Sequence, residues 1–143
     1  MVPINYLAVL VSTLVMMVLG ALWYGPLFGK QWIALMGFDP EKVREAQEAG
    51  MKSMWRSYAL MALGALCMSF VLSHTLIFAS TYLHSEGIAA GIQVGFWTWL
   101  GFIAPVTLGS VIWEGKPWTL WAINAGYYLT GLLAIGVLLA LWV

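Results

Sequence analysis

The chain has 143 residues, of which 62% are hydrophobic and 8% are charged. About a quarter of the residues in soluble domains are charged, so this composition excludes an ordinary soluble fold and indicates an integral membrane protein. Six basic and six acidic residues balance to a formal net charge of zero, which gives no sign of nucleic-acid binding.

Four uncharged runs are each long enough to cross a bilayer, and they cover residues 1–29, 57–85, 87–113 and 117–143. A hydrocarbon core ~30 Å thick needs about 20 helical residues, so each run supports one span. The chain is therefore expected to be an all-α polytopic membrane protein with one transmembrane domain, residues 1–143. This predicts a bundle of four helices over residues 5–24, 55–83, 88–113 and 118–142.

The first run ends in the string LWYGPLFGK. Gly25 and Pro26 disfavour a continuing helix there, and Lys30 follows closely. Trp23 and Trp32 carry amphipathic rings of the kind that gather between hydrocarbon and headgroups. We therefore expect an elbow at the membrane interface.

Residues 27–54 form the expected interfacial segment. Asp39 is a favourable N-cap and Pro40 a favourable first helical residue, so a short helix is predicted to start there. Apolar residues then recur at helical spacing opposite a charged face, which predicts an amphipathic helix on the membrane surface.

The second run becomes more polar in its later half, which indicates a helix that faces protein there. His74 lies within it, and ionisable groups at membrane depth are often functional. Two interpretations stay open for His74: a neutral ring bonded to a neighbouring helix, or a functional group.

The third run opens with Gly87, Gly91 and Gly95 at four-residue spacing, which predicts a face for close helix packing. Pro105 lies within this run and is expected to kink its helix. Gln93 is a candidate polar partner for the aromatic rings near mid-membrane.

A second elbow precedes the fourth run and contains Trp113, Glu114, Lys116 and Pro117. It resembles the first elbow in combining Leu-Gly, an aromatic residue, glycine, proline and a basic residue, which favours a two-plus-two repeat of the parallel kind. We expect Glu114 to pair with Arg56 and tie helix three to helix two.

Asn124 and Thr107 are predicted to lie at the same depth in the inner half of the bundle, about 9 Å from the cytoplasmic ends of their helices. An unbonded amide is costly in hydrocarbon, so Asn124 should point inward. Two interpretations stay open: an interhelical clasp, or a small cavity with Trp97 and Tyr127 as its apolar wall.

The positive charges predict the orientation of the chain. Lys30, Lys42, Arg44, Lys52 and Arg56 fall between the first two helices, and Lys116 falls between the last two. By the positive-inside rule these two loops are cytoplasmic and both termini are non-cytoplasmic.

Two strings carry a family resemblance: GALWYGPLFGKQWIALMG, and the later GFWTWLGFIAPVTLGSVIWEGKPWTLWAINAGYYL. With the four-helix layout they are similar to the uncharacterised membrane-protein family known as domain of unknown function 1761. The resemblance implies a four-span membrane protein and brings no activity and no site residues with it.

The sequence contains no recognisable metal-ligand cluster, nucleophile triad or phosphate-binding loop, so we expect neither an enzyme nor a cofactor. Two functional classes remain. The first is a structural or accessory bundle in the lipid bilayer that associates with itself, as a homo-oligomer, or with a larger membrane complex. The second is a small oligomeric transporter or channel, because four helices alone enclose little volume.

Overall fold

The computed structural model describes residues 3–142, and the regular elements among them are all helical. Four helices in this part of the chain are long and apolar enough to cross a membrane: Tyr6–Leu27, Lys52–Leu83, Gly87–Ile112 and Trp118–Leu141. These findings confirm the all-α class and the count of four long apolar helices.

The first long helix starts as α1 (Tyr6–Leu22), after the side chain of Asn5 accepts a hydrogen bond from the Ala8 N–H at 3.1 Å. It continues through a π-helical turn, Trp23–Leu27, into α2 (Gly29–Met36). Pro26 has no N–H to give, so the turn widens, and the Phe28 N–H bonds to the Trp23 carbonyl at 2.8 Å.

The expected interfacial segment is two separate short helices, α2 and α3 (Pro40–Ala49). The Asp39 side chain accepts from the Glu41 N–H at 3.0 Å and so caps α3 as predicted. Gly50, with φ of +65°, separates α3 from α4 (Met51–Leu83). Helix α4 starts at Met51, earlier than the predicted start at residue 55. No proline follows Gly50 in this stretch, so the helix can begin directly after the glycine.

The third long helix is a row of four elements: α5 (Gly87–Thr98), a second π-helical turn (Trp99–Ile103), α6 (Ala104–Thr107) and α7 (Gly109–Ile112). Pro105 lies in the first turn of α6, directly after the π-helical turn. The irregularity predicted at Pro105 is thus spread over the preceding turn as well.

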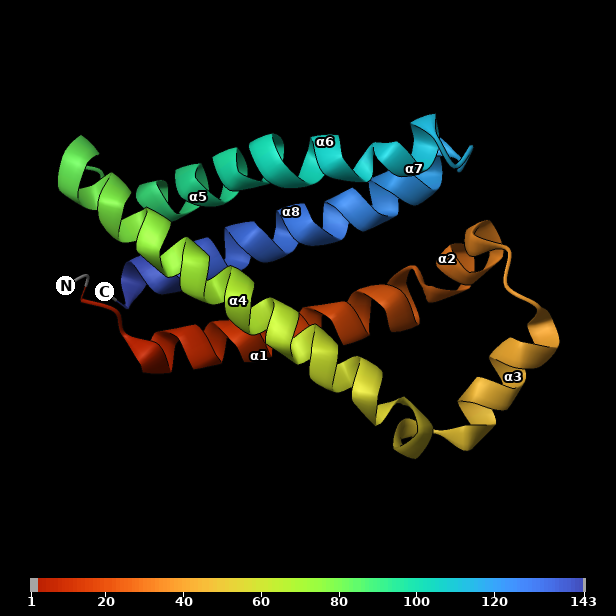
Figure 1. Ribbon diagram of the computed structural model, residues 1–143. Helices are drawn as coiled ribbons and strands as arrows, with labels where there is room; N and C mark the ends of the chain where they lie inside the picture. The colour runs from red at the N-terminus through yellow and green to blue at the C-terminus, as the bar shows by residue number, and fades with distance from the viewer. Residues whose placement is uncertain (1–2, 143) are drawn as a thin grey trace.

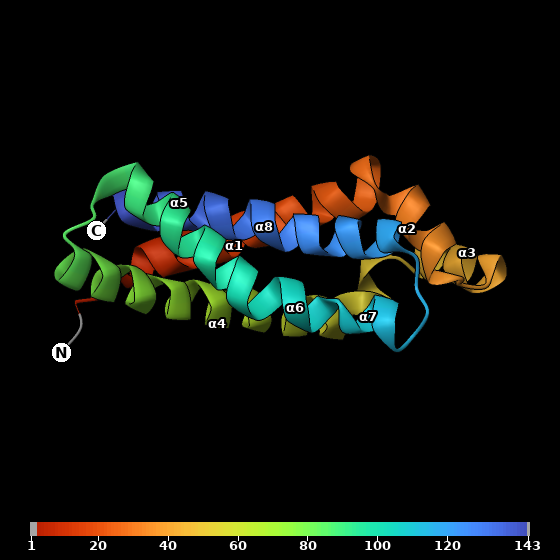
Figure 2. The same cartoon turned by 90° about the horizontal axis from the view of Figure 1, so that it is seen from above.

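Helix α8 (Trp118–Leu141) is the central helix, and it packs along α5 on one side and α1 on the other (Figure 1). Helix α4 packs mainly against α1, as the view in Figure 2 also shows. The fully buried large side chains of α8 are distributed from its first turn to its last: Leu120, Leu132, Ile135 and Leu139.

The closest helix contact is between α5 and α8. A Cβ atom at Gly91 would collide with the backbone of Gly136, and one at Gly95 would lie 2.5 Å from the Leu132 carbonyl oxygen. Gly87 does not take part, because it lies at the start of α5 with φ of +65° and open space around it. The prediction of a packing role was therefore wrong for Gly87, which instead serves the tight turn from α4.

The two ends of the molecule differ in what they carry. Both ends of the described chain and the α4–α5 turn lie at one end, and α2, α3 and the α7–α8 turn lie at the other (Figure 1). All six basic residues belong to that second end.

Candidate functional site

Asn124 of α8 is the centre of a polar cluster in the half of the bundle near α2. Its Oδ1 atom accepts two hydrogen bonds, from the Tyr24 hydroxyl at 3.0 Å and from the Trp32 Nε1–H at 3.1 Å. Both lone pairs of the amide oxygen are thereby used. We call Tyr24, Trp32 and Asn124 the Asn124 cluster, and it joins the first π-helical turn and α2 to α8.

Two tryptophans donate to the α8 backbone on either side of Asn124. Trp23 Nε1–H bonds to the Ile123 carbonyl at 2.9 Å, and Trp99 Nε1–H bonds to the Ala125 carbonyl at 2.8 Å. Each of these tryptophans is the first residue of a π-helical turn. Both irregular turns therefore serve to aim an indole at the central helix.

Tyr127 is buried one turn further along α8 and lies against the cluster. Its hydroxyl donates to the Met16 carbonyl at 3.1 Å, and its ring packs on that of Tyr24 with centroids 5.3 Å apart. Trp23 and Tyr128 also pack on the Tyr127 ring. Edge-on ring contacts of this kind add about 0.5–1.5 kcal/mol beyond the buried area.

Thr107 and Asn124, which are predicted to share a depth in the bundle, do not bond to each other. Thr107 accepts from the Trp121 Nε1–H of α8 at 3.1 Å and donates to the Ile103 carbonyl at 2.8 Å within its own helix. Each residue therefore makes its own link to a neighbouring helix, because the two side chains leave α8 and α6 toward different partners. The shared depth in the sequence does not place them in contact.

Lys116 in the α7–α8 turn closes the same end of the bundle. Its Nζ donates to the Met36 carbonyl at 3.2 Å, which satisfies one of the free carbonyls at the end of α2. Glu114 and Arg56 form no ion pair within the described residues, so the expected link between them was wrong. The Arg56 guanidinium instead lies 5.6 Å from the centre of the Trp55 ring.

The remaining elbow residues lie at the surface of this end. Trp113 is 85% exposed, and Pro117 directly precedes α8 as its N-cap residue. Gly25 has open space around the position of a Cβ atom.

Gln93 and Trp97 lie on another face of the molecule, away from the Asn124 cluster. They line a cleft of about 320 Å³ between α4 and α5, together with residues such as Thr75 and Phe102. Trp97 is 63% exposed, so it does not form the wall that the cavity interpretation assigned to it.

His74 bonds within its own helix and not to a neighbour. Its Nδ1 lies 2.9 Å from the Phe70 carbonyl, and its ring packs on the Phe70 ring with centroids 4.4 Å apart. The residue-to-residue spacing of four along α4 explains both contacts.

The Asn124 cluster is an interhelical clasp, that is, a set of hydrogen bonds that holds α8 to the first π-helical turn and α2. Its groups are an amide, a phenol and an indole, and no carboxylate, imidazole or thiol contributes to the bonds described above. Cross-helix bonds in membranes are worth about 0.6 kcal/mol on average and at most about 1.7. The five interhelical bonds that surround Asn124 therefore fix the position of α8 by their number, with none of them strong alone.

Sequence reasoning assigned Trp23 and Trp32 to a belt at the membrane surface and did not consider Tyr24 as a partner of Asn124. The structure turns all three side chains toward α8. The one signal for this was Pro26, which indicates an irregular turn at that position but not the direction in which the rings point.

Comparison with known proteins gave one match. The searches of curated proteins and of solved structures found no match. The model of the family described as "Protein of unknown function (DUF1761)" matches residues 7–140, which covers all four long helices almost completely. The chain therefore belongs to the DUF1761 family.

Proposed function

We propose that this protein is an integral membrane protein whose four long apolar helices each cross the bilayer. The exposed large apolar side chains support this. They occur on all four helices, as at Leu14, Phe78, Phe102 and Leu141. Extensive exposed apolar surface of this kind marks contact with a membrane or with another protein.

In this arrangement the end with α2 and α3 faces the cytoplasm and both termini face away from it. The location of all six basic residues at that end supports the orientation. Helix α3 lies on the membrane surface, with an ion pair between Arg44 and Glu48 on its exposed side.

The two-plus-two repeat is also part of the proposal. The first and third long helices each contain a π-helical turn that starts with tryptophan and has glycine as its third residue, WYGPL and WLGFI. Each of these tryptophans donates to the α8 backbone, so the two turns serve the same helix. The support for the repeat itself is the shared residue types of the two elbows, LWYGPLFGK and IWEGKPW.

The proposed function is that of a structural or accessory bundle that associates with a second copy or with a larger membrane complex. One observation carries it: residues 52–61 of α4 are exposed on every face of the helix. This first third of α4 includes Arg56 and Ser57 and runs away from the other long helices (Figure 1). Because no other helix of the chain covers it, its whole circumference is available to another chain.

Disulfide cross-linking tests this proposal. In a Cys67→Ser background, a cysteine at Ala59 should give cross-linked dimers, or an adduct with a resident partner, in native membranes. A cysteine at Leu10, which is exposed near the start of α1 at the end that carries both termini, is the matched control. Equal cross-linking at both positions would contradict a specific interface on α4.

A small oligomeric transporter or channel is the second candidate, and Gln93 favours it. Its side chain is exposed on the α5 surface, and no hydrogen bond to it is formed within the described residues. An amide in hydrocarbon needs a partner or water, which a pathway between copies would supply. Loss of solute flux in liposomes on Gln93→Leu, with unchanged oligomer size, would favour this candidate.

A further inference from the structure

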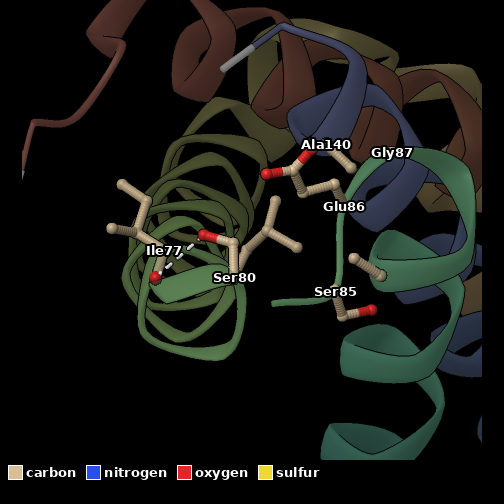
Figure 3. A pocket seen from close by; sticks show the side chains of 8 residues that line it. Ile77, Ser80, Ser85, Glu86, Gly87 and Ala140 are labelled. Atoms are coloured by element: carbon tan, nitrogen blue, oxygen red, sulfur yellow. Dashed lines mark hydrogen bonds between the residues drawn. The ribbon is translucent and has the colours of Figure 1, made fainter. Parts of the chain in front are cut away.

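A second pocket lies at the end of the molecule that carries the α4–α5 turn. It has a volume of about 340 Å³ and is lined by α4, the turn, the start of α5 and the last turn of α8 (Figure 3). All of its walls come from one chain, so no second copy is needed to form it. Its size is in the range of small-molecule sites, about 300–1,000 Å³.

The Glu86 and Ser80 side chains offer this pocket hydrogen-bond acceptors. Figure 3 shows the Glu86 side chain reaching from the turn across the space between Ser80 and Ala140. The Ser80 hydroxyl donates its proton to the Ile77 carbonyl at 3.0 Å, so only its lone pairs remain for a ligand. The Ser85 hydroxyl points away from Glu86.

Glu86 is exposed and forms no ion pair within the described residues. It is the only Asp, Glu, Lys or Arg between residues 57 and 113, and residues 3–29 and 117–142 contain none. The six basic residues lie at the opposite end of the bundle. His84, two residues away in the same turn, does not pair with Glu86 either, so the carboxylate is open to a cation from outside the chain.

The floor of the pocket is apolar. Leu76 and Ala90 are 3% and 2% exposed, and Ala140 of α8 closes the side. A hydrated metal ion would find no further charged ligand here, since no group of three His, Cys, Asp or Glu occurs within the described residues. An organic cation with hydrogen-bond donors fits both the acceptors and the floor.

We infer that this pocket binds a primary ammonium group carried on a short apolar body, with the ammonium between Glu86 and Ser80 and the body over Leu76 and Ala90. The inference goes beyond the proposed structural role and does not depend on it. A free alkylamine and the ethanolamine headgroup of a lipid share this chemistry.

Calorimetric titration with n-hexylammonium tests the inference, on the full chain in dodecyl maltoside, which carries no amine. We expect saturable binding to the wild type and none to uncharged n-hexanol. Glu86→Gln should weaken binding at least about tenfold, because it removes a charge-assisted bond. Ser80→Ala should weaken it about threefold. Glu114→Gln is the matched control, since Glu114 lies in the turn at the other end and should bind as the wild type.

A second set of titrations separates the two sources of the ammonium group. If added phosphatidylethanolamine weakens hexylammonium binding and phosphatidylcholine does not, the lipid headgroup occupies the site. If neither lipid competes, the ligand is a free amine. Competition by phosphatidylethanolamine alone and the absence of competition by either lipid both support the ammonium site. Equal binding of hexanol and hexylammonium, or equal affinity of the Glu86→Gln and Glu114→Gln variants, would overturn the inference. Because the titration needs no bilayer, failure of the membrane proposal would appear only in membrane labelling experiments.

Discussion

At the scale of single residues, the placement of Asn124 illustrates how a polar group is kept in an apolar bundle. Its amide oxygen receives two donors from another part of the chain, Tyr24 and Trp32. The donors are themselves large amphipathic rings that fill the space around the amide. The site thus meets the cost of burying an amide with bonds and with packing at once.

Asn124→Ala is predicted to lower the free energy of unfolding by about 1–2 kcal/mol, because two donors lose their common acceptor. Reversible unfolding in mixed detergent micelles measures the change. Thr130→Ala is the control, since Thr130 bonds only within its own helix, to the Gly126 carbonyl at 2.9 Å. Equal losses in the two variants would show that the clasp adds nothing to stability.

Trp99→Phe is predicted to lower the free energy of unfolding by about 1 kcal/mol, because the indole loses its bond to the Ala125 carbonyl. Trp97→Phe should change it little, since that indole is 63% exposed. The pair of variants compares the same substitution two residues apart, and thermal melting in detergent measures both. A larger loss for Trp97→Phe would mean that its exposed face carries a partner.

At the scale of elements, the contact between α5 and α8 depends on glycines that let the two backbones meet. Gly91 and Gly136 face one another, so neither position has room for a Cβ atom. Close approach increases the dispersion contacts between the helices, which is the attraction that lipid does not replace.

Gly91→Ala is predicted to destabilise the bundle by about 1–3 kcal/mol, because its methyl group meets backbone atoms that have no room to move aside. Gly64→Ala in α4 should be neutral or stabilising by up to about 1 kcal/mol, since open space surrounds it and alanine favours the helix. Unfolding by increasing SDS fraction ranks the two variants. Wild-type stability of Gly91→Ala would refute the close contact of α5 with α8.

At the scale of the whole molecule, the two ends of the bundle differ in the charged residues they carry. One end carries the basic residues, α2 and α3, and the other carries Glu86 as its one acidic side chain within the described residues. This separation is the observation from which the orientation in the membrane is proposed.

Labelling of single cysteines in a Cys67→Ser background tests the orientation. We expect an impermeant maleimide added to intact cells to modify a cysteine at Glu86 and to leave one at Glu48 unmodified until the membrane is opened. The reason is that these positions belong to opposite ends of the bundle. Modification at Glu48 alone would reverse the topology, and modification of both in sealed cells would argue against a membrane-spanning arrangement.

The sequence by itself determined the all-α class and the number of long apolar helices. Both depend on the length of uncharged runs, which is a local property of the chain. It also placed the irregular turn at Pro26, the cap at Asp39 and the small face of Gly91 and Gly95, because each of these follows from the stereochemistry of a few adjacent residues.

Only the tertiary structure decided which residues meet. The bonds from Tyr24 and Trp32 to Asn124 span about a hundred residues of chain, and they depend on how the first π-helical turn rotates the rings toward α8. The same holds for Thr107, whose partner is Trp121 and not Asn124, and for Gly87, which shapes a turn and has open space at its Cβ position. Depth along a helix can be counted from a sequence, but the direction of a side chain around the helix axis is set by the packing of all four helices together.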